Sequence, residues 1–595
     1  MKTTKNIARL AVTAGLTAAL SFGGVMAPVT MAFAAGGGST VTFNDPDYAA
    51  STTYKGIQIF KANVTTTNGA TTVSGIDWAS PEIKMAVVAA IQVKDPSYFS
   101  DIAQDAAEWL NTNAGVTVAD SKVESNNVLS SIAANLEGKS GWKKTTTGDA
   151  TLSGLEAGYW LFLTDTAGKP DGKSTDALTS PVYAVIDGTS TTTVKPKKSV
   201  PTVEKKILDD NNANNELTAV PVKDWKDVAD SQIGQEVNYK LTGTIASNYA
   251  TFGTYAYKFT DVLSGGLDYV NGSVEVYALN NGVYTKIDTD HYSVDYASTG
   301  KTLTVEFKAG TGDKGLKDVE GVAADTQIVV FYKAKLNSNA VIGNSADGSE
   351  GGNPNTVTLT YSNNPYADGT GETIKDTVAD FTFRLNLNKV DQGTEQGLQG
   401  AVFTIQSADA NTQGQYVASK PDAAKGVVAG QLVTVTDASN LPEYVKFKSG
   451  NEGKIAVSGL DAGSYKVTEV QTPDDTKYTK ASPFTFTITP NYDDSTMRVS
   501  ELKAEVSKDD KNRTDIAFGK LDDTAGDNRL TGMDNTGTNA AAGEVTINVG
   551  NTKSIGLPLT GLNGVTFTWI AGGAVLCIGV AHLIRSRKRD DGFEE

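Results

Sequence analysis

Short runs in which apolar and polar residues alternate recur along most of the chain, and this period of two constrains the fold more than any other feature. Residues 301–307 read KTLTVEF and residues 235–241 read QEVNYKL, so that every second side chain is apolar. Successive side chains of a β-strand point to opposite faces, and the alternation therefore predicts strands with one buried face. Gly, Asn and Asp separate the runs, as they do in turns. The sequence predicts an all-β protein built from sandwich domains.

The start of the chain reads as a targeting segment rather than as part of the fold. Three basic residues among the first nine precede an Ala-rich apolar stretch, and residues 32–34 (AFA) match the small-x-small pattern of a signal peptidase site. We therefore expect residues 1–34 to be a signal peptide and the mature protein to begin near Ala35.

Composition argues against several function classes for the exported part. The one cysteine is Cys577, inside a C-terminal apolar run, and the two histidines are His291 and His582. This leaves no disulfide or cysteine metal site in the exported part and argues against a histidine-based metal centre or catalytic triad. The formal net charge of -17 disfavours a nucleic-acid partner. Residues 209–216 (DDNNANNE) could offer oxygen ligands to calcium, but an acidic turn is the better interpretation. We expect no metal and no cofactor.

About 525 residues remain between the terminal segments, enough for three or four domains. Apolar spacing in the first of these blocks, residues 35–197, predicts helices near residues 83–93 and 103–110, inserted into a sandwich. The expected units are an N-terminal immunoglobulin-like domain at 35–197, a middle domain at 198–377, a C-terminal domain at 378–553 and a terminal segment at 554–595.

The terminal segment combines three parts in a fixed order. An apolar run at 565–584 follows a pentapeptide, and a basic tail follows the run. The run is long enough to cross a bilayer as a transmembrane helix, and the positive tail would hold its end on the cytoplasmic side. This order resembles the LPXTG cell-wall sorting signal of Gram-positive surface proteins. The resemblance implies that a sortase cleaves after the threonine and joins its carboxyl group to an amine. The pentapeptide consists of Leu557, Pro558, Leu559, Thr560 and Gly561.

A second motif lies between the first two blocks. Residues 193–201 read TVKPKKSVP, and the prolines and lysines predict an exposed, semi-rigid junction. The run also resembles the pilin motif of sortase-assembled pili, in which Tyr-Pro-Lys follows a Val-x-Val strand. Pro196 and Lys197 match the last two positions, whereas Lys195 replaces the tyrosine. The resemblance implies that Lys197 is the linking lysine, with Lys198 as the alternative.

The third block carries a lysine on its first strand, an acid in its middle and an asparagine at the end of its last strand. These are Lys389, Glu469 and Asn551. Residues 463–473 (GSYKVTEVQTP), with the later Tyr478, resemble the E-box of Cna B-type pilin domains. In that family such a trio forms an intramolecular isopeptide bond, which implies a Lys389–Asn551 bond assisted by Glu469.

The second block shows the same order of residue types. Lys205, Asp261 and Asn363 are its counterparts, and the run FTDVLS around Asp261 resembles the family's middle domain. The resemblance implies a Lys205–Asn363 bond, with Lys206 and Asn364 as alternative registers. The first block offers Lys55 and Lys61 but no matching acid and no asparagine on its last strand, so we expect no bond there.

The chemistry of such a trio follows from burial. A low-dielectric site disfavours the ammonium form of a lysine and favours the neutral form of an acid. The neutral acid can donate to the asparagine carbonyl and make its carbon electrophilic. Oriented intramolecular pairs reach effective molarities on the order of 10⁵ M or more. Ammonia leaves and an amide joins the first and last strands. Because the reaction occurs once per domain, Asp261 and Glu469 would be autocatalytic acids, and the protein would not be a turnover enzyme.

Together these motifs resemble a backbone pilin of Gram-positive sortase-assembled fimbriae. The resemblance implies a structural subunit at the cell surface, polymerised through Thr560 of one subunit and Lys197 of another, for adhesion or colonisation. Its implied partners are a sortase, identical subunits, accessory pilins, peptidoglycan and a host receptor of unknown identity. The alternative is a monomeric wall-anchored adhesin or stalk. A secreted enzyme lacks support, because no nucleophile–histidine pair or phosphate loop is evident.

Overall fold

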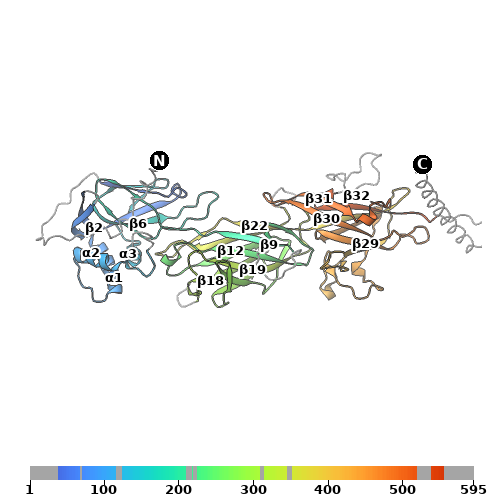
Figure 1. Cartoon of the computed structure of the whole chain (residues 1–595), viewed down its shortest axis with the longest axis horizontal. Helices are drawn as coiled ribbons and strands as arrows, with labels where there is room; N and C mark the ends of the chain where they lie inside the picture. The colour runs from blue at the N-terminus through green and yellow to red at the C-terminus, as the bar shows by residue number, and fades with distance from the viewer. Residues whose placement is uncertain are drawn as a thin grey trace, which may run out of the picture.

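Three β-rich bodies follow one another along the length of the molecule (Figure 1). The computed structural model describes residues 38–67, 70–115, 123–209, 217–218, 224–308, 314–344, 351–518 and 538–554. The prediction of an all-β chain with a helical insertion in its first part is confirmed. We refer to the three bodies as the first, middle and C-terminal domains.

The first domain contains two sheets. One has three strands in the order β5-β1-β8, and the other has five strands in the order β3-β2-β6-β7 with β4 beside β2. Alternating burial along β1 follows its VTF pattern, because Val41 and Phe43 enter the core. The strands are β1 (Ser39–Phe43), β2 (Thr53–Thr67), β3 (Ala70–Trp78), β4 (Lys143–Lys144), β5 (Thr151–Leu155), β6 (Gly158–Thr166), β7 (Val182–Ile186) and β8 (Thr191–Val194).

The helical insertion lies between β3 and β4 and comprises α1 (Pro81–Lys94), α2 (Ala103–Asn113) and α3 (Val128–Leu136). Helix α1 starts where Ser80 accepts a hydrogen bond from the Ile83 amide at 3.3 Å, with Pro81 at the first helical position. The two helices predicted from sequence are confirmed. The third was not predicted, although Asn127 caps it by accepting from the Leu129 amide.

The middle domain is a sandwich of two seven-stranded sheets. One has the order β10-β9-β12-β19-β15-β16 with β14 beside β19, and the other has the order β11-β22-β20-β13-β18-β17 with β21 beside β20. The strands are β9 (Val203–Leu208), β10 (Trp225–Lys226), β11 (Val228–Asp230), β12 (Glu236–Thr244), β13 (Tyr257–Leu263), β14 (Leu267–Tyr269), β15 (Glu275–Asn280), β16 (Val283–Lys286), β17 (Tyr292–Ala297), β18 (Thr302–Phe307), β19 (Gln327–Leu336), β20 (Asn353–Ser362), β21 (Thr370–Glu372) and β22 (Asp376–Phe381).

The C-terminal domain pairs a five-stranded sheet, β28-β23-β34-β32 with β33 beside β34, with a seven-stranded sheet, β26-β25-β24-β29-β30-β31 with β27 beside β24. Its first and last strands are parallel neighbours. The strands are β23 (Phe383–Asp391), β24 (Val402–Ser407), β25 (Tyr416–Val417), β26 (Leu432–Val433), β27 (Phe447–Lys448), β28 (Lys454–Leu460), β29 (Gly463–Gln471), β30 (Phe484–Asp493), β31 (Arg498–Val506), β32 (Ile516–Phe518), β33 (Thr538–Asn539) and β34 (Glu544–Asn551). Single 3-10 turns occur at Tyr249–Thr251, Leu316–Asp318, Ala423–Lys425, Glu443–Val445, Asn451–Gly453 and Lys508–Asp510.

Hydrogen bonds connect neighbouring domains. The Leu178 amide of the first domain donates to the Asn363 carbonyl oxygen of the middle domain at 2.6 Å. At the other junction, the Tyr492 hydroxyl of the C-terminal domain donates to the buried Asp230 carboxylate at 2.6 Å. The domains therefore meet through specific polar contacts as well as through their linkers.

Candidate bond-forming sites

The C-terminal domain brings the predicted lysine and asparagine together across its two neighbouring parallel strands. Lys389 on β23 aligns with Val549 on β34, and Asn551 lies two residues further along β34. Both side chains point into the core, and the Lys389 ammonium nitrogen, Nζ, is hydrogen-bonded to the side-chain oxygen of Asn551. The attacking and attacked groups of the predicted reaction are therefore in direct contact.

The predicted acid reaches this pair from the opposite sheet. Glu469 on β29 places Oε1 3.4 Å from Lys389 Nζ and accepts a hydrogen bond from the Asn551 side-chain amide at 3.0 Å. Its second oxygen accepts from the Ala481 backbone amide at 2.7 Å, which fixes the carboxylate in place. One carboxylate thus contacts both the nucleophile and the leaving group.

Burial sets the electrostatics of this site. Lys389 is 0% exposed, and the Phe403 ring lies with its centroid 5.7 Å from the ammonium. Burial lowers the pKa of Lys389 to about 8, although the nearby Glu469 carboxylate opposes part of that shift. Neutral amine is therefore present as a minor fraction near neutral pH, and the neutral amine is the form that can attack a carbonyl carbon.

The middle domain builds a related site from both of its sheets. Lys205 on β9 donates to the Asp261 carboxylate on β13 at 2.5 Å and to the Tyr332 hydroxyl on β19 at 2.9 Å. Lys205 and Asp261 are fully buried. Burial lowers the pKa of Lys205 to about 8 against the opposing effect of Asp261. The alternative lysine, Lys206, faces away from the core and pairs with Asp227 at 2.6 Å.

Asn355, rather than the predicted Asn363, is the asparagine at the middle site. The Asn355 amide donates to the Tyr332 hydroxyl at 2.6 Å, and Asn355 is 0% exposed. Asp261 pairs with Val357 in the β13–β20 ladder, which places Asn355 one inward-facing position from the acid. Asn363 lies eight residues further along, about 25 Å away for an extended strand.

Asn363 instead belongs to the junction with the first domain. Its side-chain amide donates to the Asp176 carbonyl oxygen at 3.3 Å. The alternative register, Asn364, accepts a hydrogen bond from the Tyr366 amide and is equally remote along the chain. The structure therefore does not bring Asn363 or Asn364 to Lys205, whereas Lys205 and Asn355 both donate to the Tyr332 hydroxyl.

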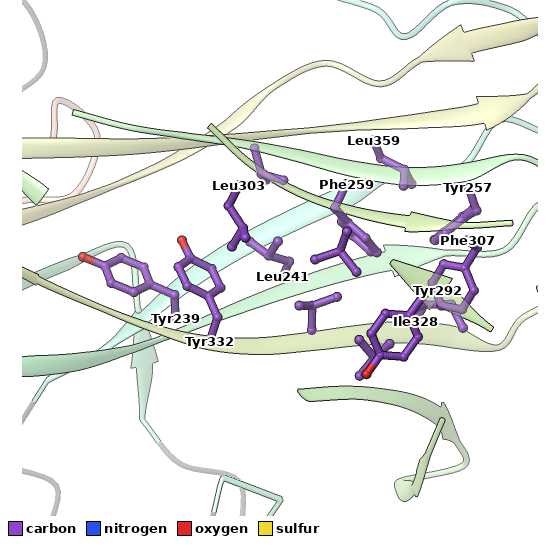
Figure 2. Close-up of a cluster of buried hydrophobic side chains, with 14 of the residues drawn as sticks. Tyr239, Leu241, Tyr257, Phe259, Tyr292, Leu303, Phe307, Ile328, Tyr332 and Leu359 are labelled. Atoms are coloured by element: carbon purple, nitrogen blue, oxygen red, sulfur yellow. The ribbon is translucent and has the colours of Figure 1, made fainter. Parts of the chain in front are cut away.

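Tyr332 is the second residue that sequence reasoning missed. Its hydroxyl donates to Asp261 and accepts from Lys205 and Asn355. The ring stacks on that of Tyr239, with centroids 5.2 Å apart and 13° between the planes (Figure 2). Regular alternation on β20 could have indicated Asn355, which shares the buried face with Val357. No such signal marks Tyr332, because residues 328–332 (IVVFY) are buried on both faces of β19.

Lys197 and Lys198, the two junction lysines between the first and middle domains, have different environments. The Lys197 backbone amide donates to the Thr179 hydroxyl at 2.7 Å and its carbonyl accepts from Ser180, which anchors the main chain to the first domain. Within the described part of the chain, the Lys197 ammonium has no hydrogen-bond or ion-pair partner. Lys198, by contrast, lies between two buried carboxylates, Asp45 at 2.5 Å and Asp176, and its side chain is 10% exposed.

The lysines of the first domain have no asparagine partner among the described residues. Lys55 is buried and forms ion pairs with Glu137 at 2.5 Å and Asp165 at 3.4 Å, beside the Trp142 ring. Lys61 lies on β2 next to β3, paired in register with Asp77. The expectation of no isopeptide bond in this domain stays a prediction.

Several predicted features fall outside the described residues. These are the signal peptide at 1–34, the sorting motif at 557–561, the apolar run at 565–584 and most of the acidic segment at 209–216. No helix in the described ranges has the length and hydropathy needed to span a membrane. The described residues also contain no cluster of His, Cys, Asp or Glu arranged to hold a metal ion.

Two known families match parts of the chain. Residues 233–365 match the family described as Gram-positive pilin backbone subunit 2, Cna-B-like domain. This part of the chain is therefore similar to backbone pilins of Gram-positive bacteria. Residues 383–503 match the SpaA prealbumin-like fold domain, which covers most of the C-terminal domain. Backbone pilins are structural proteins and not enzymes.

One curated relative matches the chain at low sequence identity. The trypsin-resistant surface T6 protein of Streptococcus pyogenes is 24% identical over 333 residues, which is 53% of this chain and 51% of that protein. The chain thus matches about half the length of that curated relative.

Two solved structures resemble most of the chain at low identity. The T6 backbone pilin of serotype M6 Streptococcus pyogenes is 15% identical with a TM-score of 0.47, covering 87% of this chain and 98% of its own. The full-length major pilin SpaD of Corynebacterium diphtheriae is 17% identical with a TM-score of 0.44, covering 88% and 99%.

Proposed function

We propose that this protein is the repeating subunit of a covalent surface fimbria. A sortase cleaves after Thr560 and holds the new carboxyl group as an acyl intermediate. The Lys197 amine of a second subunit attacks that intermediate, so a Thr560–Lys197 amide joins the two. Repetition gives a linear polymer of identical subunits, to which accessory pilins can be added and which is finally joined to peptidoglycan.

The environment of the junction lysines is the observation that carries this proposal. An intermolecular nucleophile must be able to extend from its own surface into the sortase active site that holds the acyl intermediate. The Lys197 ammonium is free of partners within the described residues, while its backbone is held by Thr179 and Ser180. Lys198 would first have to break ion pairs with the buried Asp45 and Asp176, which costs several kcal/mol. This difference supports Lys197 over Lys198 as the linking residue.

Two internal isopeptide bonds complete the proposed subunit. In the C-terminal domain, Lys389 joins Asn551 with Glu469 as the acid, supported by direct contacts among all three. In the middle domain, Lys205 joins Asn355, with Asp261 as the acid. Each bond forms as the amine attacks the side-chain carbonyl carbon and ammonia departs. These bonds would strengthen each subunit of a fibre that must bear tension.

The polymer is tested by substituting the two junction lysines separately in the cell that makes the protein. Arginine keeps the positive charge but its guanidinium stays protonated and cannot attack. We expect wild type and Lys198→Arg to give a ladder of high-mass species that resists boiling in SDS, and Lys197→Arg to give single subunits. Arginine at 198 can retain the ion pairs, which makes it a matched control.

The other outcomes each contradict a stated part of the proposal. A ladder that persists in Lys197→Arg and disappears in Lys198→Arg would assign the link to Lys198. A ladder in both variants would remove this junction from the mechanism. Single subunits in the wild type would identify a monomeric wall-anchored protein instead.

A further inference from the structure

The Tyr332 hydroxyl occupies the centre of the middle-domain site. Its oxygen accepts from Lys205 Nζ at 2.9 Å and from Asn355 Nδ2 at 2.6 Å, while its proton is donated to the Asp261 carboxylate. One donor and two acceptor positions exhaust the hydrogen-bonding capacity of a phenol. The hydroxyl therefore touches the nucleophile, the acid and the group that must leave.

The C-terminal site has a different construction. There the Glu469 carboxylate itself accepts from the Asn551 amide at 3.0 Å and lies 3.4 Å from Lys389 Nζ. In the middle site the acid is an aspartate, whose side chain is one methylene shorter. Among the described residues, Asp261 makes no hydrogen bond to Asn355, and the Tyr332 oxygen fills the gap between them.

We propose that Tyr332 is a catalytic residue of the middle-domain site, relaying a proton from Asp261 to the departing nitrogen of Asn355. The inference rests on the proposed function, because it presupposes a Lys205–Asn355 bond. Lys205 first transfers a proton to Asp261, which leaves a neutral amine and a neutral acid. The Nζ–Cγ bond then forms, the Cγ–Nδ2 bond breaks, and Nδ2 leaves as ammonia. The proton that Nδ2 needs passes from Asp261 through the Tyr332 hydroxyl, and the second proton that Nζ gives up on becoming an amide nitrogen returns to the Asp261 carboxylate.

The surroundings of Tyr332 suit a relay. The ring is 1% exposed and is held against Tyr239, so the hydroxyl has one orientation relative to the three groups (Figure 2). Burial raises the pKa of Tyr332 well above its ordinary value, and the Asp261 carboxylate adds to that effect. The phenol thus keeps its proton at rest and can pass one on only while receiving another.

The test follows the rate of each internal bond in the full-length chain. Samples taken at intervals after synthesis are digested, and the Lys205–Asn355 cross-linked peptide is quantified by mass spectrometry. For Tyr332→Phe we expect the rate of formation of that bond to fall by about 100-fold or more, which is the loss typical of removing a general acid–base group. The Lys389–Asn551 bond of the same molecules serves as an internal standard and should form at the wild-type rate.

Tyr257→Phe is the matched control. Tyr257 is also fully buried in this core, at the opposite end from Tyr332 in Figure 2, and its hydroxyl donates to the Thr244 carbonyl oxygen at 3.0 Å. The control therefore loses a buried phenol hydrogen bond without touching the site. We expect it to form the Lys205–Asn355 bond at the wild-type rate.

A rescue variant separates a relay from a packing role. Asp261→Glu introduces the longer acid that contacts its asparagine directly in the C-terminal domain. In the Tyr332→Phe background it should restore much of the rate, because the acid no longer needs an intermediary. If Tyr332→Phe is slow and the double variant is no faster, the hydroxyl acts through packing and the relay is wrong.

Two further results have distinct meanings. If the wild type forms the Lys205–Asn355 bond and Tyr332→Phe forms it as fast as Tyr257→Phe, the relay is refuted while the proposed bond stands. If the wild type never forms the bond, the proposed function of the middle site fails, and the relay fails with it.

Discussion

Replacing Lys389 by methionine should destabilise the C-terminal domain strongly, because it removes the proposed covalent tie between the first and last strands. Methionine keeps most of the length of the buried lysine stem and carries no charge. Glu469 retains its hydrogen bonds from the Asn551 amide and the Ala481 backbone amide. The chief loss is therefore the cross-link itself.

The magnitude follows from the loop that the bond closes. Lys389 and Asn551 are 162 residues apart in sequence. In the chain-entropy treatment of cross-links, closing a loop of that size removes about 17 cal/mol/K from the unfolded chain, or about 5 kcal/mol at 25 °C. For a domain of this size each kcal/mol moves the melting temperature by about 2–4 °C. We expect the variant to melt roughly 10–20 °C below the wild type.

Differential scanning calorimetry of the full-length chain measures this shift. Lys466→Met is the matched control, because Lys466 is exposed on β29 of the same domain and should tolerate the same substitution with little effect. Intact-mass measurement first establishes that the wild type carries the bond, as the loss of one ammonia from this domain. If the bond is present and Lys389→Met melts within a few degrees of the control, the cross-link does not act by restricting the unfolded chain, and the reasoning is wrong.

Two more predictions concern the asparagines. Asn355→Ala should prevent the proposed bond of the middle domain, so its intact mass should lack one ammonia fewer than that of the wild type, relative to the sequence mass. Asn363→Ala should leave the bond intact. The reverse pattern would reinstate the sequence-based pairing. In Asn551→Ala, Lys389 keeps its amine, whose pKa falls from 10.5 to about 8 on folding. Between those values the unfolded chain holds a proton that the folded chain has lost, so stability should rise with pH by at most about 3 kcal/mol relative to the wild type, whose amide does not titrate. Denaturant midpoints of the two proteins across that window check the sign, and a constant difference would contradict it.

Local periodicity predicted much of this architecture. Alternation located most strands and their buried faces, and the E-box-like run placed Glu469 opposite the ends of the first and last strands. All three residues of the C-terminal site could be named because the E-box-like run at 463–473 resembles that of Cna B-type domains, which implies an acid at Glu469 between a lysine on the first strand and an asparagine at the end of the last. The contacts of Lys389 with Asn551 and Glu469 follow from the parallel pairing of β23 with β34 and from the sheet facing them.

The middle site exposes the limit of that reasoning. Asn355 and Asn363 are eight residues apart, so a period of two places both on the same side, and both are buried. Only the pairing of β13 with β20, in which Asp261 lies opposite Val357, selects between them. The ion pair between Lys198 and Asp45 could not be predicted from the sequence either, because the two residues are 153 positions apart. Long-range register, rather than local propensity, decides which polar groups meet.

The positions of the proposed links also account for where internal bonds occur. With the proposed links, tension would enter a subunit at Lys197 and leave at Thr560, so the first domain would lie outside the path of force and would need no covalent tie. From Lys197 the path runs along the chain to Lys205 and crosses the proposed bond to Asn355, which bypasses roughly 150 residues, or about 500 Å of extended chain. It continues to Lys389 and crosses to Asn551, which bypasses a further 162 residues. A Lys205–Asn363 bond would bypass a similar length of chain, but Asn363 lies about 25 Å along the strand from Asn355 at the middle site, farther than a lysine side chain reaches. In each domain on the proposed path of force, the proposed tie thus lies where the described strands bring a buried amine, an acid and an amide together.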